Sequence, residues 1–432
     1  MDIRYAHIAD APPGTPPLAA RAGDLIFSGG QIAVHPKEGI PGETRLVPGY
    51  PFHGSKIERQ LRYVYAMLGD GLESLGSSLH QVMKINSYHV NPDEIDMALR
   101  LRSTLFNEKT PPASTLVIIP ETVAPEASVV LDVVAVAADS KLPQEGKEQP
   151  KIGRGPLRNI FGWPVYSQAF RAGGLIFTQG TTFGFVDGLP AKENFQRSDM
   201  PYSQYLMRDY TRLVLKELVG ILENAGCSLE DVVKADVYIQ DPSDLAAVDE
   251  AWSEFFPSDP PARVITPLPI QEMMPAKRLE IEFIAIDPEG SFKKETIFTK
   301  EAPLPLGPVP QAVKAGPYLF FSTQMATDYK QGLPSEARPD PEFPFHSSGI
   351  KRQVEYIYRN VGAICRAAGT GPENLVRRRA AHTDLNEMAA AEDAWYKHLG
   401  DRLPPTTIYR CNSPLTVPAC TVQYDLTAFI TS

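Results

Sequence analysis

Residues 232–269 read VVKADVYIQDPSDLAAVDEAWSEFFPSDPPARVITPLP, and this stretch decides the fold. Its first nine residues alternate in character, which predicts a strand. DLAAVDEAWSEFF follows and is predicted to form a helix. After a proline-rich segment, a second run of strand-forming residues begins at Ala262. The stretch therefore predicts a strand, a helix and a further strand, in that order.

The same pattern occurs three times along the chain. VMKINSYHVNPDEI begins 150 residues before Val232, and LVRRRAAHTDLNEM begins 143 residues after it. The segments AGDLIF, AGGLIF and AGPYLF are spaced by the same two offsets. PFHGSKIERQ at 51–60 and PFHSSGIKRQ at 344–353 are separated by both offsets together. Segments that stay in register over this distance indicate triplication of one domain.

Each copy predicts an α+β domain with the order β-β-α-β-α-β-β, a mixed sheet with two helices on one face. The predicted domains span 1–140, 155–287 and 303–432, and polar linkers around 140–155 and 288–305 join them. A sheet covered on one face must bury its other face. We therefore expect the three domains to pack sheet to sheet around a pseudo-threefold axis.

The 432 residues have a formal net charge of −10, and the sequence pI is about 5.4. This balance argues against nucleic acid or an anionic membrane as the main partner. The four cysteines form no disulfide framework, and no His or Cys motif predicts a metal site. The N-terminus resembles no signal peptide, and no apolar run is long enough to span a bilayer. We expect a cytoplasmic protein that acts on a small molecule.

Three motifs carry a resemblance to a known family. The SGGQ turn, the stretch 232–269 and the closing RLEIEFIAI resemble the RidA family, also called YjgF or reactive-intermediate deaminases. The resemblance is strongest in the second copy and covers most of the chain. It implies three RidA-like (chorismate mutase-like) domains. Because family members usually are homotrimers of one short domain, it also implies an intramolecular pseudo-trimer, monomeric in solution or further dimerised.

The resemblance also implies a reaction. Family members hydrolyse an enamine or imine to a carbonyl compound and ammonia, without a metal or organic cofactor, in clefts between adjacent domains. An arginine in a PAR motif binds the carboxylate of a small substrate, because its planar guanidinium fixes both charge and orientation. A glutamate on the last strand holds the attacking water. A tyrosine before the first strand and a serine in the following turn complete the cleft.

The family pattern assigns three catalytic residues, and all lie in the second copy: Arg263, Glu280 and Tyr166. At the arginine and glutamate positions, the first copy has Ser114 and Val130, and the third has Thr407 and Gln423. The sites of the first and third copies are therefore predicted to be degenerate. A buried carboxylate without its partner costs several kcal/mol.

The substrate-binding candidates lie in the outer copies. Arg263 is predicted to share its cleft with the turn of a neighbour, either Gly29–Gly30 or Ser322–Thr323, and Tyr166 then lines another cleft. His53 and His346, in the repeated PFH loops, are further candidates because histidine titrates near neutral pH. Packing of these loops before a helix is the competing interpretation, and the one we favour.

Two alternatives to imine hydrolysis remain open at this point. The fold can support another cofactor-free hydrolysis, a cyclisation or an elimination in a specialised pathway. The chain can also be a ligand-binding protein without catalysis. Cys411 and Cys420 are predicted to be small core residues rather than nucleophiles.

Overall fold

The computed structural model describes most of the chain. The described residues are 2–50, 53–106, 110–141, 157–158, 164–182, 185–186, 189–190, 206–270 and 277–431. They form three large mixed sheets, each accompanied by a pair of α-helices, so the predicted α+β class is confirmed. Among the helices of these residues, none combines the length and the apolar composition that crossing a bilayer needs.

The first sheet has the strand order β1-β2-β3-β6-β4-β5. Its strands are β1 (Arg4–Ala6), β2 (Ala19–Ala22), β3 (Leu25–Ser28), β4 (Val82–His89), β5 (Ala113–Ile118) and β6 (Val129–Val136). Its helices are α1 (Lys56–Ser74) and α2 (Ile95–Leu105). β4 and β5 are parallel, and α2 connects them. The other neighbours are antiparallel.

The second sheet has the strand order β14-β13-β15-β10-β9. Its strands are β9 (Ala169–Ala172), β10 (Leu175–Thr178), β13 (Val232–Ile239), β14 (Ala262–Pro267) and β15 (Leu279–Ile286). Its helices are α3 (Leu206–Asn224) and α4 (Leu245–Phe255). Two small pairs are separate from it: β7 (Leu157–Arg158) with β8 (Pro164–Tyr166), and β11 (Phe185–Val186) with β12 (Leu189–Pro190).

The third sheet has the strand order β16-β17-β18-β21-β19-β20. Its strands are β16 (Lys294–Ile297), β17 (Ala312–Ala315), β18 (Tyr318–Phe321), β19 (Leu375–His382), β20 (Thr406–Arg410) and β21 (Val422–Phe429). Its helices are α5 (Gly349–Ala368) and α6 (Met388–Leu399).

The predicted order β-β-α-β-α-β-β matches the second sheet, and the first and third sheets add one strand at an edge. The additional strand β16 lies within 288–305, which was predicted to be a linker throughout. That prediction was wrong, because β16 pairs with β17 and completes the edge of the third sheet. Most of the other predicted linker, 140–155, lies outside the described residues.

Local sequence signals explain where the helices begin and end. The side chain of Ser348 accepts a hydrogen bond from Lys351 N at the start of α5, and Ser55 caps α1 by accepting from Glu58 N. α5 ends at Gly369, whose φ of 83° is readily adopted only by glycine. Between these caps, the apolar residues of α5 recur at helical spacing and are buried against the third sheet.

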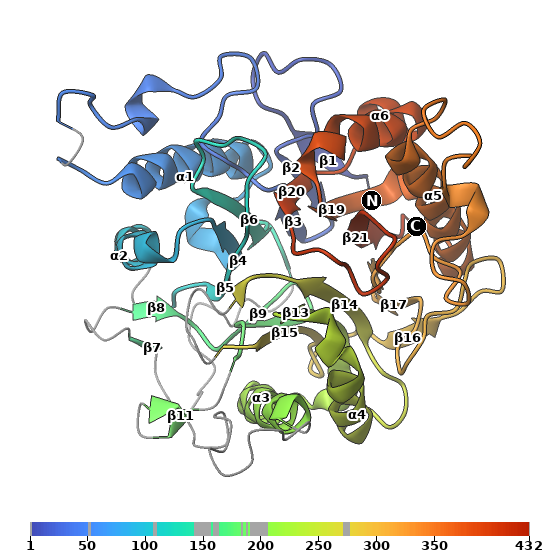
Figure 1. The fold of residues 1–432 in the computed structure, drawn as a ribbon. Coiled ribbons are helices and arrows are strands. Elements are labelled where there is room, and N and C mark those ends of the chain that lie inside the picture. The colour runs from blue at the N-terminus through green and yellow to red at the C-terminus, as the bar shows by residue number, and fades with distance from the viewer. Residues whose placement is uncertain are drawn as a thin grey trace, which may run out of the picture.

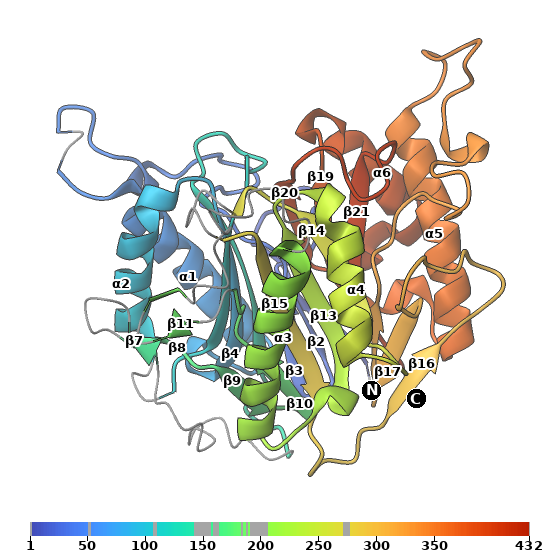
Figure 2. The ribbon, with the colours of Figure 1, turned by 60° about the horizontal axis from the view of Figure 1, so that its bottom comes forward.

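The helices lie around the outside of the molecule, and the three sheets face one another inside (Figure 1). Figure 2 shows α3 and α4 lying along the outer face of the second sheet. The inner faces share one hydrophobic core, to which equivalent positions contribute Phe27, Phe177 and Phe320, each at most 2 % exposed. Each sheet therefore has one helix-covered face and one inner face.

A cycle of buried ion pairs joins the three inner faces. Lys84 of the first sheet pairs with Glu282 of the second, Lys234 of the second with Asp425 of the third, and Arg377 of the third with Asp132 of the first, each at 2.6 Å. We call these three pairs the ion-pair cycle. Arg379 adds bonds to Asp132 at 3.2 Å and to Asp236 at 2.8 Å. Every one of these side chains is less than 10 % exposed.

Two buried histidines predict a pH dependence of stability. Burial lowers the pKa of His89 to about 3 and that of His382 to about 4, from an ordinary 6.5. The unfolded chain therefore takes up protons first as the pH falls. The contribution of the two histidines to the free energy of unfolding is fully present above pH 6.5. It decreases toward pH 4, by about 1.4 kcal/mol per pH unit for each histidine.

The chain offers a matched replacement, because Ile239 occupies the equivalent position in the second sheet. We expect the H89I/H382I double variant to show a shallower loss of unfolding free energy than the wild type between pH 7 and 4.5, measured by urea denaturation. Equal slopes in the two proteins would contradict this account.

Candidate functional site

A turn from each sheet lies on the edge strand of another sheet. Three backbone hydrogen bonds define these contacts: Gly30 N donates to Thr406 O (3.0 Å), Gly180 N to Ser114 O (2.9 Å) and Thr323 N to Arg263 O (3.0 Å). The first sheet thus contacts the third, the second contacts the first, and the third contacts the second. Of the two neighbours predicted for Arg263, the structure places the Ser322–Thr323 turn beside it.

Arg263 lies on β14 at the edge of the second sheet and is 4 % exposed. Its side chain lies on the helix-covered face, as that of Ile265 does two residues later. Its guanidinium forms an ion pair with Asp249 of α4 and packs over the ring of Trp252, 4.8 Å from the centroid. Burial lowers the pKa of Arg263, and the charge of Asp249 opposes that effect. An arginine remains protonated under these conditions.

One nitrogen of this guanidinium lacks a hydrogen bond. Nη1 of Arg263 is buried, and the described residues offer it no acceptor, whereas Nη2 is held by Asp249. An unsatisfied buried donor costs about 1–3 kcal/mol, and more when it is charged. Because Arg263 also lines a cavity, a bound anion can supply the missing acceptor.

This cavity, the Arg263 cleft, has a volume of about 130 Å³ and lies between the second and third sheets. Most of its wall is apolar: Leu245, Ile265, Pro305, Leu306, Val309, Met325 and Val417. Its polar wall includes Arg263, Asp249, Ser322 and Thr323. Thr416 and Tyr329 line it as well, so the cleft offers one cation, one carboxylate and four hydroxyls in otherwise apolar surroundings.

The hydroxyls of Ser322 and Thr323 mainly hold the cleft together. Ser322 Oγ accepts from Arg263 N at 3.0 Å and donates to Pro310 O at 2.6 Å. Thr323 Oγ1 accepts from Ile265 N at 3.1 Å. These bonds fix the turn of the third sheet on β14. The predicted substrate-binding residues Ser322 and Thr323 thus lie in the cleft, with their hydroxyl groups engaged by the backbone.

Gly307 lies over the Asp249–Arg263 pair, in the segment between β16 and β17. Its φ is 81°, and a Cβ built on it would lie 3.0 Å from Asp249 Oδ2 and 3.9 Å from Arg263 Nη2. Both the backbone conformation and the close approach favour glycine at this position. The segment around Gly307 therefore forms the outer wall of the cleft.

Glu280 does not share a cleft with Arg263. Arg263 is on the helix-covered face, whereas Glu280 alternates on β15 with Leu279 and Ile281, which belong to the helix-side core. Glu280 is 4 % exposed, forms an ion pair with Lys277 and lies against Gly180. The predicted combination of Arg263 with Glu280 in one cleft was therefore wrong.

Tyr166 lies in the contact between the first and second sheets, as predicted for a cleft other than that of Arg263. The adjacent Ser167 N donates to Pro112 O at 3.2 Å. Burial raises the pKa of Tyr166 to about 12, an effect that nearby Arg102 opposes and nearby Glu280 reinforces. Tyr166 and Glu280 thus both lie at the contact between the first and second sheets.

The sequence interpretation missed two arginines at the outer clefts. Arg102 Nη1 of α2 donates to Ser114 Oγ at 2.6 Å, and Arg378 Nε of β19 donates to Thr406 Oγ1 at 3.2 Å. Both hydroxyls occupy the strand position that Arg263 occupies on β14. At each of these two strand positions, a guanidinium from another element therefore lies beside the hydroxyl. A signal was present: Arg102 stands where the other copies have tryptophan.

The register also corrects one predicted correspondence. Arg263 pairs with Ala235, and the equivalent pair in the third sheet is Arg378 with Thr406, so Thr406 rather than Thr407 is its counterpart. Thr407 Oγ1 instead donates to Asp132 at 3.1 Å, on the inner face.

The remaining substrate-binding candidates lie away from the Arg263 cleft. Gly29 and Gly30 pack on β20, where a Cβ at Gly29 would lie 2.7 Å from Thr406 N. His53 and His346 are exposed in their loops, where their rings lie edge-on to Tyr50 and Phe343. Neither histidine is among the residues lining the Arg263 cleft, and their ring contacts agree with the loop packing that we favour.

The four cysteines are free and buried. Cys411 and Cys420 belong to the hydrophobic core of the third sheet, as predicted. Burial raises the pKa of both thiols to about 12, which keeps them protonated near neutral pH. In the described part of the chain, no three His, Cys, Asp or Glu side chains are grouped so that they could hold a metal ion.

The second sheet matches a known protein family. The family model described as Endoribonuclease L-PSP matches residues 163–287. A RutC family protein of Pyrococcus horikoshii is 35 % identical over 111 residues, which cover 26 % of this chain and 79 % of that protein. Reactive Intermediate Deaminase A, chloroplastic, of Arabidopsis thaliana is 27 % identical over 121 residues, which cover 28 % of this chain and 59 % of that protein.

Solved structures are similar as well. A RidA of an Antarctic Psychrobacter is 26 % identical, with 32 % of this chain and 99 % of that chain covered and a TM-score of 0.25. A chorismatase is 10 % identical, with 81 % of this chain and 93 % of that chain covered and a TM-score of 0.48.

The Asp249–Arg263 pair generates a prediction about stability. D249A leaves the buried Arg263 without its carboxylate, and we expect a loss of about 2 kcal/mol in unfolding free energy, because breaking a buried pair costs about 3–5 kcal/mol and Asp249 is partly exposed. D249E is the matched control, since Glu392 fills the equivalent role beside Arg378. Urea denaturation measures both variants. A loss below about 0.5 kcal/mol for D249A would show that solvent already satisfies Arg263.

Proposed function

Because the chain belongs to the RutC and Endoribonuclease L-PSP family, we propose that it hydrolyses a carboxylate-bearing enamine or imine to a carbonyl compound and ammonia in the Arg263 cleft. A relative with the name Reactive Intermediate Deaminase A supports the reaction type. The proposed location rests on the buried, unsatisfied Nη1 of Arg263, because this residue lines a cavity. A substrate carboxylate supplies the acceptor that this nitrogen lacks.

Charge and surroundings support carboxylate binding. The apolar wall lowers the local dielectric, so a charge-assisted bond from Arg263 is stronger there than in water. Asp249 forms an ion pair with the guanidinium, and the ring of Trp252 packs against the guanidinium plane. The orientation of the guanidinium is therefore fixed before a ligand arrives. Preorganisation of this kind reduces the entropic cost of binding.

The reaction needs one water and little assistance. A protonated imine carbon is already electrophilic. Water adds to that carbon, and one of its protons moves to the nitrogen. The C–N bond of the resulting carbinolamine then breaks, and the hydroxyl proton leaves with the ammonia as ammonium, so that a carbonyl group remains. Asp249 is the one carboxylate among the described residues that line the cleft, so we assign it the role of holding the water and accepting its proton.

We further propose that the three sheets are fused copies of the family's domain. The common strand order, the cyclic contacts of the turns and the ion-pair cycle support this interpretation. The chain then replaces a trimer of short subunits.

Ammonia release tests the proposed reaction. An amino-acid oxidase generates the imine, and the wild type is expected to accelerate its hydrolysis. R263M is expected to lower kcat/KM by at least about 100-fold, because it removes the charge-assisted bond from Nη1 to the substrate carboxylate. R212M, which alters an exposed ion pair with Glu254, serves as the control and retains full activity.

A third variant separates the two clefts. E280Q is expected to leave ammonia release within about threefold of the wild type, because Glu280 faces away from Arg263. If E280Q rather than R263M abolishes activity, the reaction belongs to the cleft of Tyr166. If the wild type binds carboxylates without accelerating ammonia release, the protein is a binding protein and the proposed reaction is wrong.

Native mass spectrometry tests the proposed fusion. The fused copies already occupy each other's interfaces, so a single chain of 47.5 kDa is expected as the smallest stable species. A dimer is compatible with this account, whereas an obligate trimer of chains would contradict it.

A further inference from the structure

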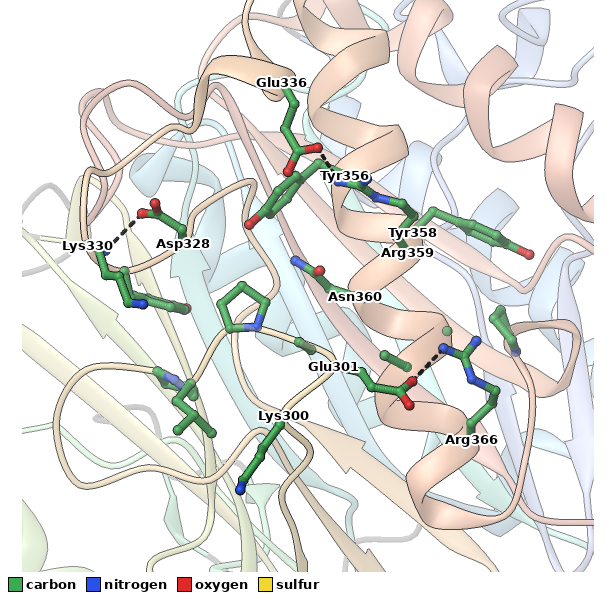
Figure 3. Close-up of a pocket in the computed structure, with 18 of the residues that line it drawn as sticks. Lys300, Glu301, Asp328, Lys330, Glu336, Tyr356, Tyr358, Arg359, Asn360 and Arg366 are labelled. Carbon is green, nitrogen blue, oxygen red and sulfur yellow. Dashed lines mark hydrogen bonds and ion pairs between the residues drawn. The ribbon is translucent and has the colours of Figure 1, made fainter.

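A larger groove adjoins the Arg263 cleft. It has a volume of about 1250 Å³ and lies on the third sheet's side of the molecule, against α5. Figure 3 shows Tyr356 and Asn360 projecting from α5 toward the loop that contains Asp328 and Lys330. Lys300 and Glu301 lie on a separate segment of the groove's wall (Figure 3).

Three residues line both the groove and the cleft: Pro305, Leu306 and Tyr329. We call them the neck. Two of them are hydrophobic, and Tyr329 presents an aromatic side chain. Leu306 is 68 % exposed and nearby Leu304 is 56 % exposed, which is unusual for large apolar side chains at the wall of a cavity. An apolar ligand group that contacts them would remove this surface from water, worth about 25 cal/mol per Å².

Tyr329 is held in a strained backbone conformation at the neck. Its φ is 53°, a left-handed value that a bulky residue rarely adopts. Local bonds fix the loop: Thr327 Oγ1 accepts from Tyr329 N at 3.0 Å, and Asp328 Oδ1 accepts from Lys330 N at 2.8 Å. Strain of this kind persists where the surrounding structure enforces it, which motivates a search for function. Here it places an aromatic residue between two cavities.

The size of the cleft limits what it can hold alone. A cavity of 150 Å³ accommodates a molecule of about the size of benzene. At about 130 Å³, the Arg263 cleft has room for a carboxylate, the reacting carbon and a short substituent. A longer substituent has to continue past the neck into the groove.

The two arginines of the groove are paired with carboxylates. Arg359 pairs with Glu336 and Arg366 pairs with Glu301, each at 3.0 Å. These cations are therefore already balanced by carboxylates. Lys300, Lys330 and Asp328 also line the groove, and Asn360 is a polar group on α5. The neck itself is apolar and aromatic.

We infer that the substrate is a carboxylate with a bulky apolar or aromatic substituent, whose carboxylate binds Arg263 and whose substituent extends past Leu306 and Tyr329 into the groove. This inference rests on the proposed function and narrows its substrate class. It predicts discrimination by size: an imine with a benzyl substituent should react better than one with a methyl substituent.

The test compares the imines that an amino-acid oxidase makes from phenylalanine and from alanine. In the wild type, kcat/KM is expected to be at least about 10-fold higher for the phenylalanine-derived imine, the order of magnitude that a few methylenes supply in an apolar pocket. L306S and Y329N are expected to reduce this ratio to below about 3. Asparagine tolerates the left-handed backbone, so Y329N removes the ring without adding strain. V47S replaces another exposed apolar side chain and is expected to keep the ratio.

The outcomes separate the inference from the proposed function. Equal kcat/KM for the two imines in the wild type would overturn the inference and leave the deaminase proposal intact. If neither imine is hydrolysed, the deaminase proposal fails, and calorimetric binding of phenylpyruvate and pyruvate decides the inference instead. Tighter binding of phenylpyruvate that is lost in L306S and in Y329N supports it, whereas equal affinities, or a preference unchanged in both variants, overturn it.

Discussion

The ion-pair cycle is the interaction on which the rest of the structure depends. Lys84–Glu282, Lys234–Asp425 and Arg377–Asp132 each join two sheets, so together they close the three sheets on one another. Loss of one partner would leave a buried charge unpaired, at a cost of about 3–5 kcal/mol. Apolar packing alone is not directional, whereas these pairs fix the register of one sheet on the next. That register brings the turn of each sheet onto the edge strand of its neighbour, and the Arg263 cleft forms at one such contact.

The two faces of a strand explain how the site is divided. Adjacent side chains on a strand point to opposite faces, so one sheet can serve two clefts. The second sheet presents Arg263 to the third sheet and Glu280 to the first. Arg263 and Glu280 thus lie beside different neighbouring sheets within a single chain. This division favours Asp249, on the same side as Arg263, as the carboxylate of the proposed reaction.

Much of the fold could be predicted from the sequence, because the repeat fixes three equivalent strand orders and a sheet with one helix-covered face must bury the other. The sequence could not show which neighbouring sheet contacts Arg263. That depends on the direction in which the three sheets follow one another around the molecule. The exposure of His53 and His346 could not be predicted, because the residue types of a loop do not reveal how it packs. Arg102 was missed because its guanidinium reaches Ser114 of β5 from the helix α2, and no strand motif describes that position.

A crystal structure of the protein with a bound 2-oxo acid tests the central claim most directly. The account predicts the carboxylate in the Arg263 cleft, with an oxygen about 2.7–2.9 Å from Nη1 and Asp249 still on Nη2. It would be contradicted by a carboxylate bound beside Tyr166 and Glu280, with the Arg263 cleft empty or filled by a protein group bonded to Nη1.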